Sequence, residues 1–144
     1  MSYTVDVNVL LYASDEASPR HAGARELVER MARGPEIAYL FWPTVMAYLR
    51  LATHPAVFAR PLPFAAAVGN VGQLLARPHV QAPGEQDRFW DRYLEVANDA
   101  APGGNLVPDA HLVALMLENG VSTIWTHDRD FRRFSGVDVR DPFE

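Results

Sequence analysis

Apolar and polar positions follow two different periods along this chain. Short runs rich in β-branched and aromatic residues favour strands, whereas apolar residues that recur every three or four positions favour amphipathic helices. The predicted strands cover residues 3–7, 37–41, 78–83, 122–126 and 137–139. A first short helix is predicted to begin at residue 9. Longer helices are predicted over residues 20–33, 44–53, 64–77, 84–97 and 109–119, and a last short helix ends at residue 134. This alternation predicts an α/β sandwich around a mostly parallel sheet.

The first predicted strand contains one carboxylate in an otherwise aliphatic run. Asp6 lies near the carboxyl end of this strand, and Asn8 is a suitable N-cap for a helix that starts at Val9. A carboxylate at a buried strand end is costly unless it is hydrogen-bonded, paired or bound to a metal ion. Asp6 is therefore either a hydrogen-bonded structural residue or a ligand whose partners come from elsewhere in the chain.

Composition limits the classes of function that remain. The chain has 144 residues, of which 49% are hydrophobic, so we expect one domain over residues 1–144. It has no cysteine, which excludes a thiolate zinc site. Neither a signal sequence nor an apolar stretch near the roughly 20 residues that span a bilayer is evident, so we expect a soluble, cytoplasmic protein without membrane contacts. The net charge of −5 disfavours generic nucleic-acid binding through a basic face, but not a nuclease whose carboxylates hold a cation.

More carboxylates follow later predicted elements. Asp128 and Asp130 come directly after the strand 122–126, and Asp109 lies in the first turn of a helix preceded by a Gly-Gly loop. Ligands of open parallel sheets collect outside the carboxyl ends of the strands, so these residues can share a cleft with Asp6. Asp109 can also be a helix N-terminal residue favoured by the dipole, and Asp128 can be an N-cap. Clustered carboxylates favour a bound Mg²⁺ or Mn²⁺ ion, which suits oxygen ligands.

Such an acidic site predicts hydrolysis of a phosphodiester. A divalent cation can activate water and stabilise the attacking and leaving oxygens of an in-line displacement at phosphorus. A small metal-dependent phosphatase is disfavoured, because the first strand does not end in an Asp-x-Asp nucleophile motif.

Three segments together carry a family resemblance. Residues Val5 to Leu11, Pro108 to Ala114 and Thr126 to Phe131 resemble, in this order, the acidic motifs of PIN-domain ribonucleases. Over nearly its full length the chain is similar to the VapC-type toxins of type II toxin-antitoxin systems. The resemblance implies a three-layer sandwich whose central sheet has strand order 3-2-1-4-5 and is flanked by helices. It also implies Mg²⁺-dependent endonucleolysis of RNA, with a transfer RNA or ribosomal RNA as substrate, a homodimer, and inhibition by a cognate antitoxin.

The resemblance assigns roles to the acidic residues. Asp6 and Asp109 match the principal metal ligands of the family, and Asp128 matches the acid after the fourth strand. Asp130 would assist from outside this ligand set or at a second ion. Asn8 would orient Asp6 through a hydrogen bond, or act only as a helix cap.

Residues next to the last motif have two readings each. Thr126 matches a hydroxyl position often found two residues before the family acid, but also suits a plain strand residue. His127 either contacts the substrate or has a structural role. Arg129, Arg132 and Arg133 can bind RNA phosphates or pair with carboxylates near the C-terminus.

One feature departs from the family pattern. Many members carry a glutamate on the helix after the second strand, which here falls around Val45 to Ala47, where the chain has no acid. Glu85 and Glu118 are candidate substitutes, although both are predicted to lie on helix surfaces. Without this charge, the sequence is compatible with a site that binds either one or two metal ions. It also leaves the alternative of a catalytically impaired PIN-like module that binds RNA or an antitoxin.

Overall fold

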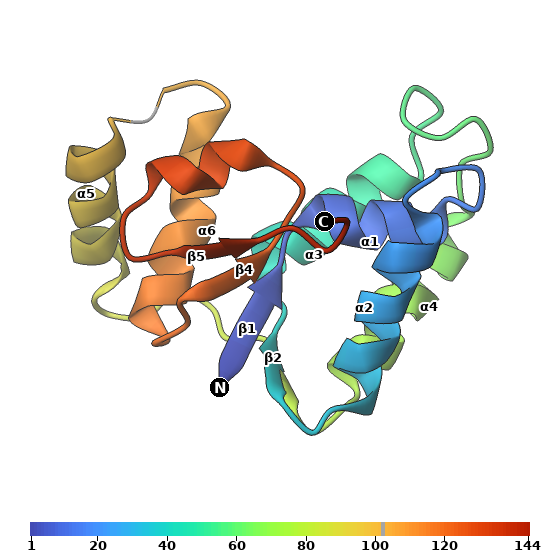
Figure 1. Ribbon diagram of the computed structural model, residues 1–144, viewed down its shortest axis with the longest axis horizontal. Coiled ribbons are helices and arrows are strands. Elements are labelled where there is room, and N and C mark those ends of the chain that lie inside the picture. Colours follow the sequence, from blue (N-terminus) through green and yellow to red (C-terminus); the bar gives the residue numbers. More distant parts are fainter. Residues whose placement is uncertain (102) are drawn as a thin grey trace.

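The central element of the fold is a parallel sheet. The computed structural model describes residues 1–101 and 103–144, and within them five strands form one sheet of order β3-β2-β1-β4-β5 (Figure 1). The strands are β1 (Ser2–Val5), β2 (Ile37–Tyr39), β3 (Val80–Gln81), β4 (Thr123–Trp125) and β5 (Asp138–Arg140). Every neighbouring pair is parallel. The predicted strand order is therefore confirmed, and β1 lies at the centre of the sheet.

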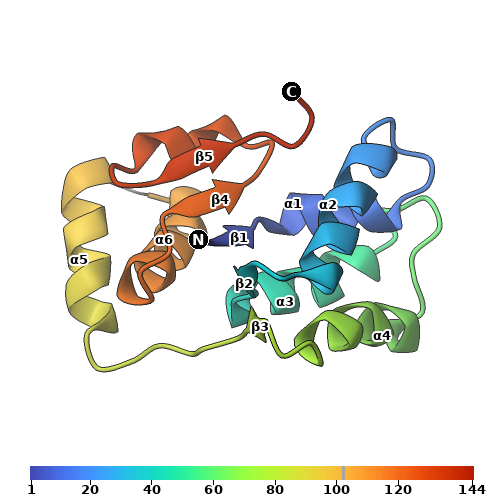
Figure 2. The ribbon, with the colours of Figure 1, turned by 60° about the horizontal axis from the view of Figure 1, so that its bottom comes forward.

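Helices cover both faces of this sheet. They are α1 (Val7–Ser14), α2 (His21–Arg33), α3 (Trp42–Ala52), α4 (Phe64–Leu75), α5 (Phe89–Ala100), α6 (Leu106–Glu118) and the 3₁₀ helix η1 (Arg129–Arg133). Helices α1 to α4 lie on one side, and α5 and α6 lie on the other (Figures 1 and 2). This arrangement confirms the predicted three-layer sandwich. Among the described helices none is both long and apolar enough to cross a membrane.

Two apolar clusters follow from the alternation of side chains along the strands. Tyr3 and Val5 of β1 are buried in the cluster formed with α1 to α4. Ile124 of β4 belongs to the second cluster, which is formed mainly with α6 and η1. Successive side chains of a strand point to opposite faces, so Thr4 points away from Tyr3 and Val5 and donates a hydrogen bond to the Tyr39 carbonyl at 2.7 Å. With both faces covered, polar groups are left mainly to the strand ends.

The first helix begins earlier than the sequence predicts. Strand β1 ends at Val5, and α1 begins at Val7, so the N-cap is Asp6 and the prediction of Asn8 as the cap is wrong. The Asp6 carboxylate accepts a hydrogen bond from the Val7 N–H at 2.8 Å. The Asp6 N–H donates to the Trp125 carbonyl at 3.0 Å, so Asp6 stays next to the end of β4. The structural reason is that the carboxylate itself satisfies the first free N–H of the helix.

The other boundaries differ from the predicted ones by a few residues. Helix α6 begins at Leu106, three residues before the predicted start, yet Asp109 still lies in its first turn. Helix α3 begins at Trp42 instead of Thr44, with Pro43 in its first turn, where a missing N–H is tolerated. These shifts leave the predicted carboxylates at the same edge of the sheet.

Candidate metal centre

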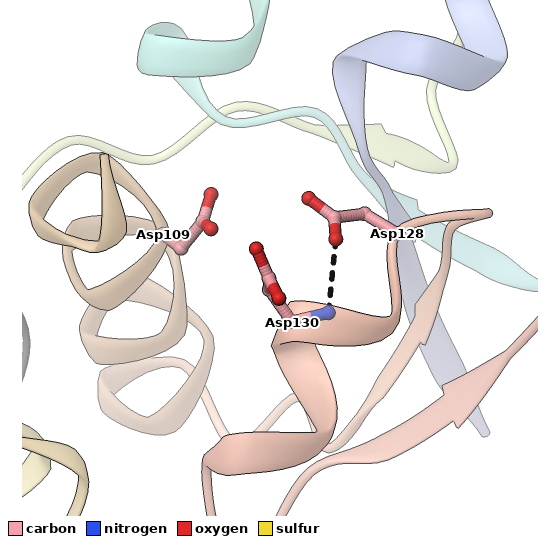
Figure 3. Close-up of side chains that lie close together, drawn as sticks. All are labelled: Asp109, Asp128 and Asp130. Carbon is pink, nitrogen blue, oxygen red and sulfur yellow. Dashed lines mark hydrogen bonds between the residues drawn. The ribbon is translucent and has the colours of Figure 1, made fainter.

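Three carboxylates meet beyond the carboxyl end of β4. One oxygen from each of Asp109, Asp128 and Asp130 lies within 4.8 Å of the other two (Figure 3). Asp109 comes from the first turn of α6, whereas Asp128 is the N-cap of η1 and Asp130 lies in the first turn of η1. Asp128 Oδ1 accepts the Asp130 N–H at 2.9 Å, which fixes the turn between these two residues. This group is called the three-carboxylate cluster below.

Asp130 lies with the other two acids of the cluster. The resemblance implies that it assists from outside the ligand set or at a second ion, and its carboxylate lies with those of Asp109 and Asp128, so its role stays a prediction. The tight turn at the start of η1 places two acids, two residues apart, on the same side. The Asp-x-Asp spacing after a strand was the sequence signal, although the direction of the second side chain depends on a turn that the sequence does not specify.

Asp6 lies beside the cluster and is held by hydrogen bonds. Its Oδ2 accepts the Thr126 hydroxyl at 2.9 Å and the Asn8 amide at 3.1 Å. The buried Thr126 Oγ1 also accepts the Asp128 N–H at 2.9 Å and the Asn8 amide at 3.2 Å. The hydrogen bond expected between Asn8 and Asp6 is therefore present, and one threonine hydroxyl links Asp6 to Asp128. A direct bond from Asp6 to a metal ion stays a prediction.

The electrostatics of the site favour a bound cation. Burial, followed by the negative charges of Asp6, Asp128 and Asp130, raises the pKa of Asp109 from 3.8 to about 7. Burial also raises the pKa of Asp6, although hydrogen bonds from Thr126 and Val7 oppose this change. A divalent cation among these oxygens would offset the repulsion, and hard oxygen ligands are those that Mg²⁺ and Mn²⁺ prefer. The side chains present therefore fit such an ion.

Of the four basic and imidazole residues next to the cluster, His127 and Arg129 lie near carboxylates of the C-terminal segment. His127 Nδ1 lies 2.8 Å from Asp141 Oδ2, which agrees with the structural reading of this histidine. Arg129 is exposed, and its guanidinium lies 4.0 Å from a carboxylate oxygen of Glu144. Arg132 and Arg133 are exposed in the last turn of η1. Contact of these arginines with RNA phosphates stays a prediction.

The candidate substitutes for the missing glutamate are engaged elsewhere. Val45 is buried in the apolar cluster of α1 to α4. Glu85 lies 2.7 Å from His111 Nε2, and Glu118 Oε1 accepts the Gln86 N–H at 3.0 Å. Among the residues that the structure describes, neither glutamate belongs to the three-carboxylate cluster. The site is thus built from aspartates.

Comparisons with known proteins identify the family and agree with the fold. The family model of the PIN domain matches residues 3–137. Ribonuclease VapC48 of Mycobacterium tuberculosis is 53% identical over 143 residues, which cover 99% of each chain. The crystal structure of VapBC2 from Rickettsia felis, bound to a promoter DNA fragment, contains a similar fold with a TM-score of 0.70 at 12% identity, covering 98% of each chain.

A second solved structure shows the same fold. The Sarcin-Ricin loop cleaving toxin VapC20 of Mycobacterium tuberculosis superposes with a TM-score of 0.67 at 18% identity, covering 94% of this chain and 98% of the other. The sheet order, the acidic edge and the family match over most of the chain agree with one another. This chain belongs to the PIN-domain family and, within it, to the VapC group.

Proposed function

We propose that this protein is a metal-dependent endoribonuclease and the toxin of a toxin-antitoxin pair. The observation that carries the proposal is the convergence of Asp109, Asp128 and Asp130, whose carboxylate oxygens lie within 4.8 Å of one another. The relative that is 53% identical over nearly the whole chain is a ribonuclease, which supports RNA as the substrate class.

The cluster would hold one Mg²⁺ ion, with Mn²⁺ as a substitute. Asp109, Asp128 and Asp130 would supply oxygen ligands, and Asp6 would add negative charge beside them or complete the set. A bound divalent cation would supply an activated water and stabilise charge on the phosphate that is cleaved. The raised pKa of Asp109 supports this assignment, because a nearby cation would let that carboxyl group ionise at neutral pH.

The hydrogen-bond network around Thr126 would hold the carboxylates of the site in position. The Thr126 hydroxyl donates a hydrogen bond to the Asp6 carboxylate and accepts one from the Asp128 N–H. The Asn8 amide donates hydrogen bonds to both Asp6 and Thr126. Fixed ligands bind a metal ion without a further loss of side-chain freedom. Thr126 and Asn8 therefore act as positioning residues for the carboxylates.

Two kinds of macromolecule would bind the protein. The RNA substrate would be a transfer RNA or a ribosomal RNA, and Arg129, Arg132 and Arg133 would contact its phosphates. A cognate antitoxin would restrain the activity, and the likeness to a toxin that was solved in a VapBC complex supports such a partner. We also propose that the protein forms a homodimer.

A cleavage assay tests the proposed activity. Purified protein, freed of antitoxin, is incubated with total RNA in the presence of Mg²⁺, Mn²⁺ or a chelator, and the Asp109→Asn variant is run beside it. Metal-dependent cleavage by the wild type and its loss in the variant are expected. Asp87→Asn, which changes an exposed carboxylate in the loop before α5, is the matched control and should cleave like the wild type.

A second candidate function rests on the absence of an acid around Val45 to Ala47. A PIN-like module with a weakened metal site would bind RNA or the antitoxin without cleaving RNA. Absence of cleavage with either metal ion, combined with retained binding of RNA or of the antitoxin, would favour this module. Equal cleavage by the wild type and Asp109→Asn would instead show that the active site is assigned wrongly.

A further inference from the structure

Residues 141–144 connect the end of the sheet with the first two helices. This segment follows β5 and runs toward α1 and α2 (Figures 1 and 2). Phe143 packs edge-on against Tyr12 of α1, with ring centroids 5.5 Å apart. The Arg20 guanidinium lies 5.5 Å from the centre of the Tyr12 ring and 6.0 Å from that of Phe143. The segment is therefore held by aromatic and cation-π contacts.

A glycine near the start of α2 allows the Phe143 ring to approach the helix closely. A Cβ atom at Gly23 would lie 3.2 Å from Cδ1 of Phe143, which is closer than most such contacts. Glycine weakens a helix relative to alanine, so its presence here calls for a local reason. The close approach of the Phe143 ring supplies that reason, because a larger side chain at this position would crowd the ring.

Asp141 connects the segment to the loop after β4. The Asp141 carboxylate is largely buried, with 8% of the side chain exposed, and it lies 2.8 Å from His127 Nδ1. Its other oxygen accepts the Phe143 N–H at 2.9 Å. Although burial raises the pKa of Asp141, the hydrogen bonds from Phe143 and His127 lower it overall, so the carboxylate stays charged. The His127 ring also packs against Phe143, with centroids 5.5 Å apart.

His127 lies between two residues of the metal centre. Thr126 bonds to Asp6 on one side of it, and Asp128 joins the three-carboxylate cluster on the other. The His127 side chain contacts residues 141–144 instead. An anchor on His127 therefore restrains the backbone that carries both Thr126 and Asp128.

We propose that Asp141 and Phe143 are positioning residues for Asp128, acting through His127. Residues 141–144 then determine how well the three-carboxylate cluster is preformed, although none of them belongs to it. The consequence for catalysis rests on the function proposed above, whereas the restraint on the 126–130 loop does not. The two can be tested separately.

Hydrogen exchange measured by NMR on the full metal-free chain tests the restraint. The Asp128 amide bonds to Thr126 and the Asp130 amide bonds to Asp128. Both should exchange about tenfold faster in Asp141→Ala, as expected for the loss of one buried hydrogen bond to a charged group. The Leu40 amide, which donates to the Gln81 carbonyl at 2.8 Å on the far side of β1, should not change. Unchanged exchange at Asp128 and Asp130 would overturn the proposal, with or without a metal ion.

Binding of Mn²⁺, measured by calorimetry without RNA, tests the effect on the site. Asp141→Ala and Phe143→Ala should each weaken binding about tenfold, as is typical when a partner that orients a metal ligand is removed. Asp141→Asn should keep most of the affinity, because its amide can still bond to both His127 and Phe143. Asp87→Ala removes an exposed carboxylate in the loop before α5 and should bind Mn²⁺ like the wild type.

Two further results separate this proposal from the function on which it rests. Wild-type protein that binds no Mn²⁺ would contradict the proposed metal centre, and the exchange rates would then decide about the restraint alone. Equal Mn²⁺ affinity of the wild type and Asp141→Ala would overturn the positioning role and leave the proposed nuclease intact. Thermal unfolding of each metal-free variant verifies that it is folded, and Phe143→Ala replaces Asp141→Ala in both tests if the latter does not fold.

Discussion

Asp6 and Asp109 lie at the same edge of the sheet but differ in their hydrogen-bond partners. Burial and the charge of Asp128 raise the pKa of Asp6, whereas hydrogen bonds from Thr126 and Val7 oppose this change. For Asp109, burial and three neighbouring negative charges all act in one direction and raise the pKa to about 7. Hydrogen bonds from the fold thus oppose the rise in the pKa of Asp6, whereas every cause acting on Asp109 raises its pKa. Asp109 is therefore a carboxylate whose charge depends on a nearby cation.

The largest expected effect is the loss of RNA cleavage in Asp109→Asn. The substitution keeps the size of the side chain but removes a charged oxygen ligand from the cluster. We expect Mg²⁺-dependent cleavage to fall at least about 100-fold, as when other preorganised groups are removed from an active site. Initial rates on total RNA measure the effect. Activity within a factor of a few of the wild type would show that Asp109 is not a ligand.

The next effect is stabilisation by divalent cations. A ligand that binds only the folded state at 100 times its Kd adds about 2.7 kcal/mol to the free energy of unfolding. Thermal unfolding with and without Mn²⁺ should show such an increase for the wild type and much less for Asp109→Asn. An equal increase in both proteins would place the cation elsewhere.

Without metal, Asp109 should make stability depend on pH. The carboxyl group has a pKa of about 7 in the folded protein against a model value of 3.8, so the folded state keeps a proton that the unfolded chain releases. The free energy of unfolding therefore falls as pH rises from about 4 to above 7, by on the order of 2 kcal/mol after allowance for solvent screening. Asp109→Asn should flatten this slope, which chemical denaturation at several pH values would measure. An unchanged slope would contradict the assigned pKa.

A smaller effect is expected on the Asp6 side of the comparison. Thr126→Val keeps the shape of the side chain but removes the hydroxyl that bonds to Asp6, Asn8 and the Asp128 N–H. Buried partners left unsatisfied should lower the free energy of unfolding by about 1–3 kcal/mol. Thr126→Ser restores the hydroxyl and is the control. Equal stability of the wild type and the valine variant would show that the network contributes little.

The smallest effect concerns the exposed arginines of η1. Arg132→Ala should weaken RNA binding and lower the slope of log affinity against log salt by about 1, because one phosphate contact is lost. Metal affinity should stay unchanged, which separates substrate binding from the carboxylate site. Fluorescence titrations with RNA at several salt concentrations measure the slope. An unchanged slope would remove Arg132 from the RNA contacts.

The sequence predicts the layers and the acidic edge because both depend on strong, local patterns. Buried parallel strands have sequences that are short apolar runs, so a carboxylate such as Asp6 stands out from the sequence alone. The N-cap was assigned to Asn8 because a boundary shift of two residues changes which polar side chain meets the free N–H groups. The place of Asp130 depends on a single 3₁₀ turn, and no local periodicity encodes it.

Contacts between distant segments were the least accessible from sequence. Asp141 and His127 are 14 residues apart, and neither residue type at this spacing indicates that the two side chains meet. Phe143 contacts the surroundings of Gly23, which lies near the other end of the chain. Such contacts follow from how the layers close, which only the folded backbone determines.

The parallel pairing of β1 with β4 has a consequence for folding of the protein. The register joins Tyr3 to Thr123, whereas the pairing of β1 with β2 joins Tyr3 to Ala38. Asp109, Asp128 and Asp130 all follow β3 in the chain, so the cluster depends on the pairing of β1 with β4, whose partners Tyr3 and Thr123 are far apart in sequence. Long-range pairings also form slowly, since the intervening loop must be closed first. The three-carboxylate cluster is therefore complete only after this long-range pairing has formed.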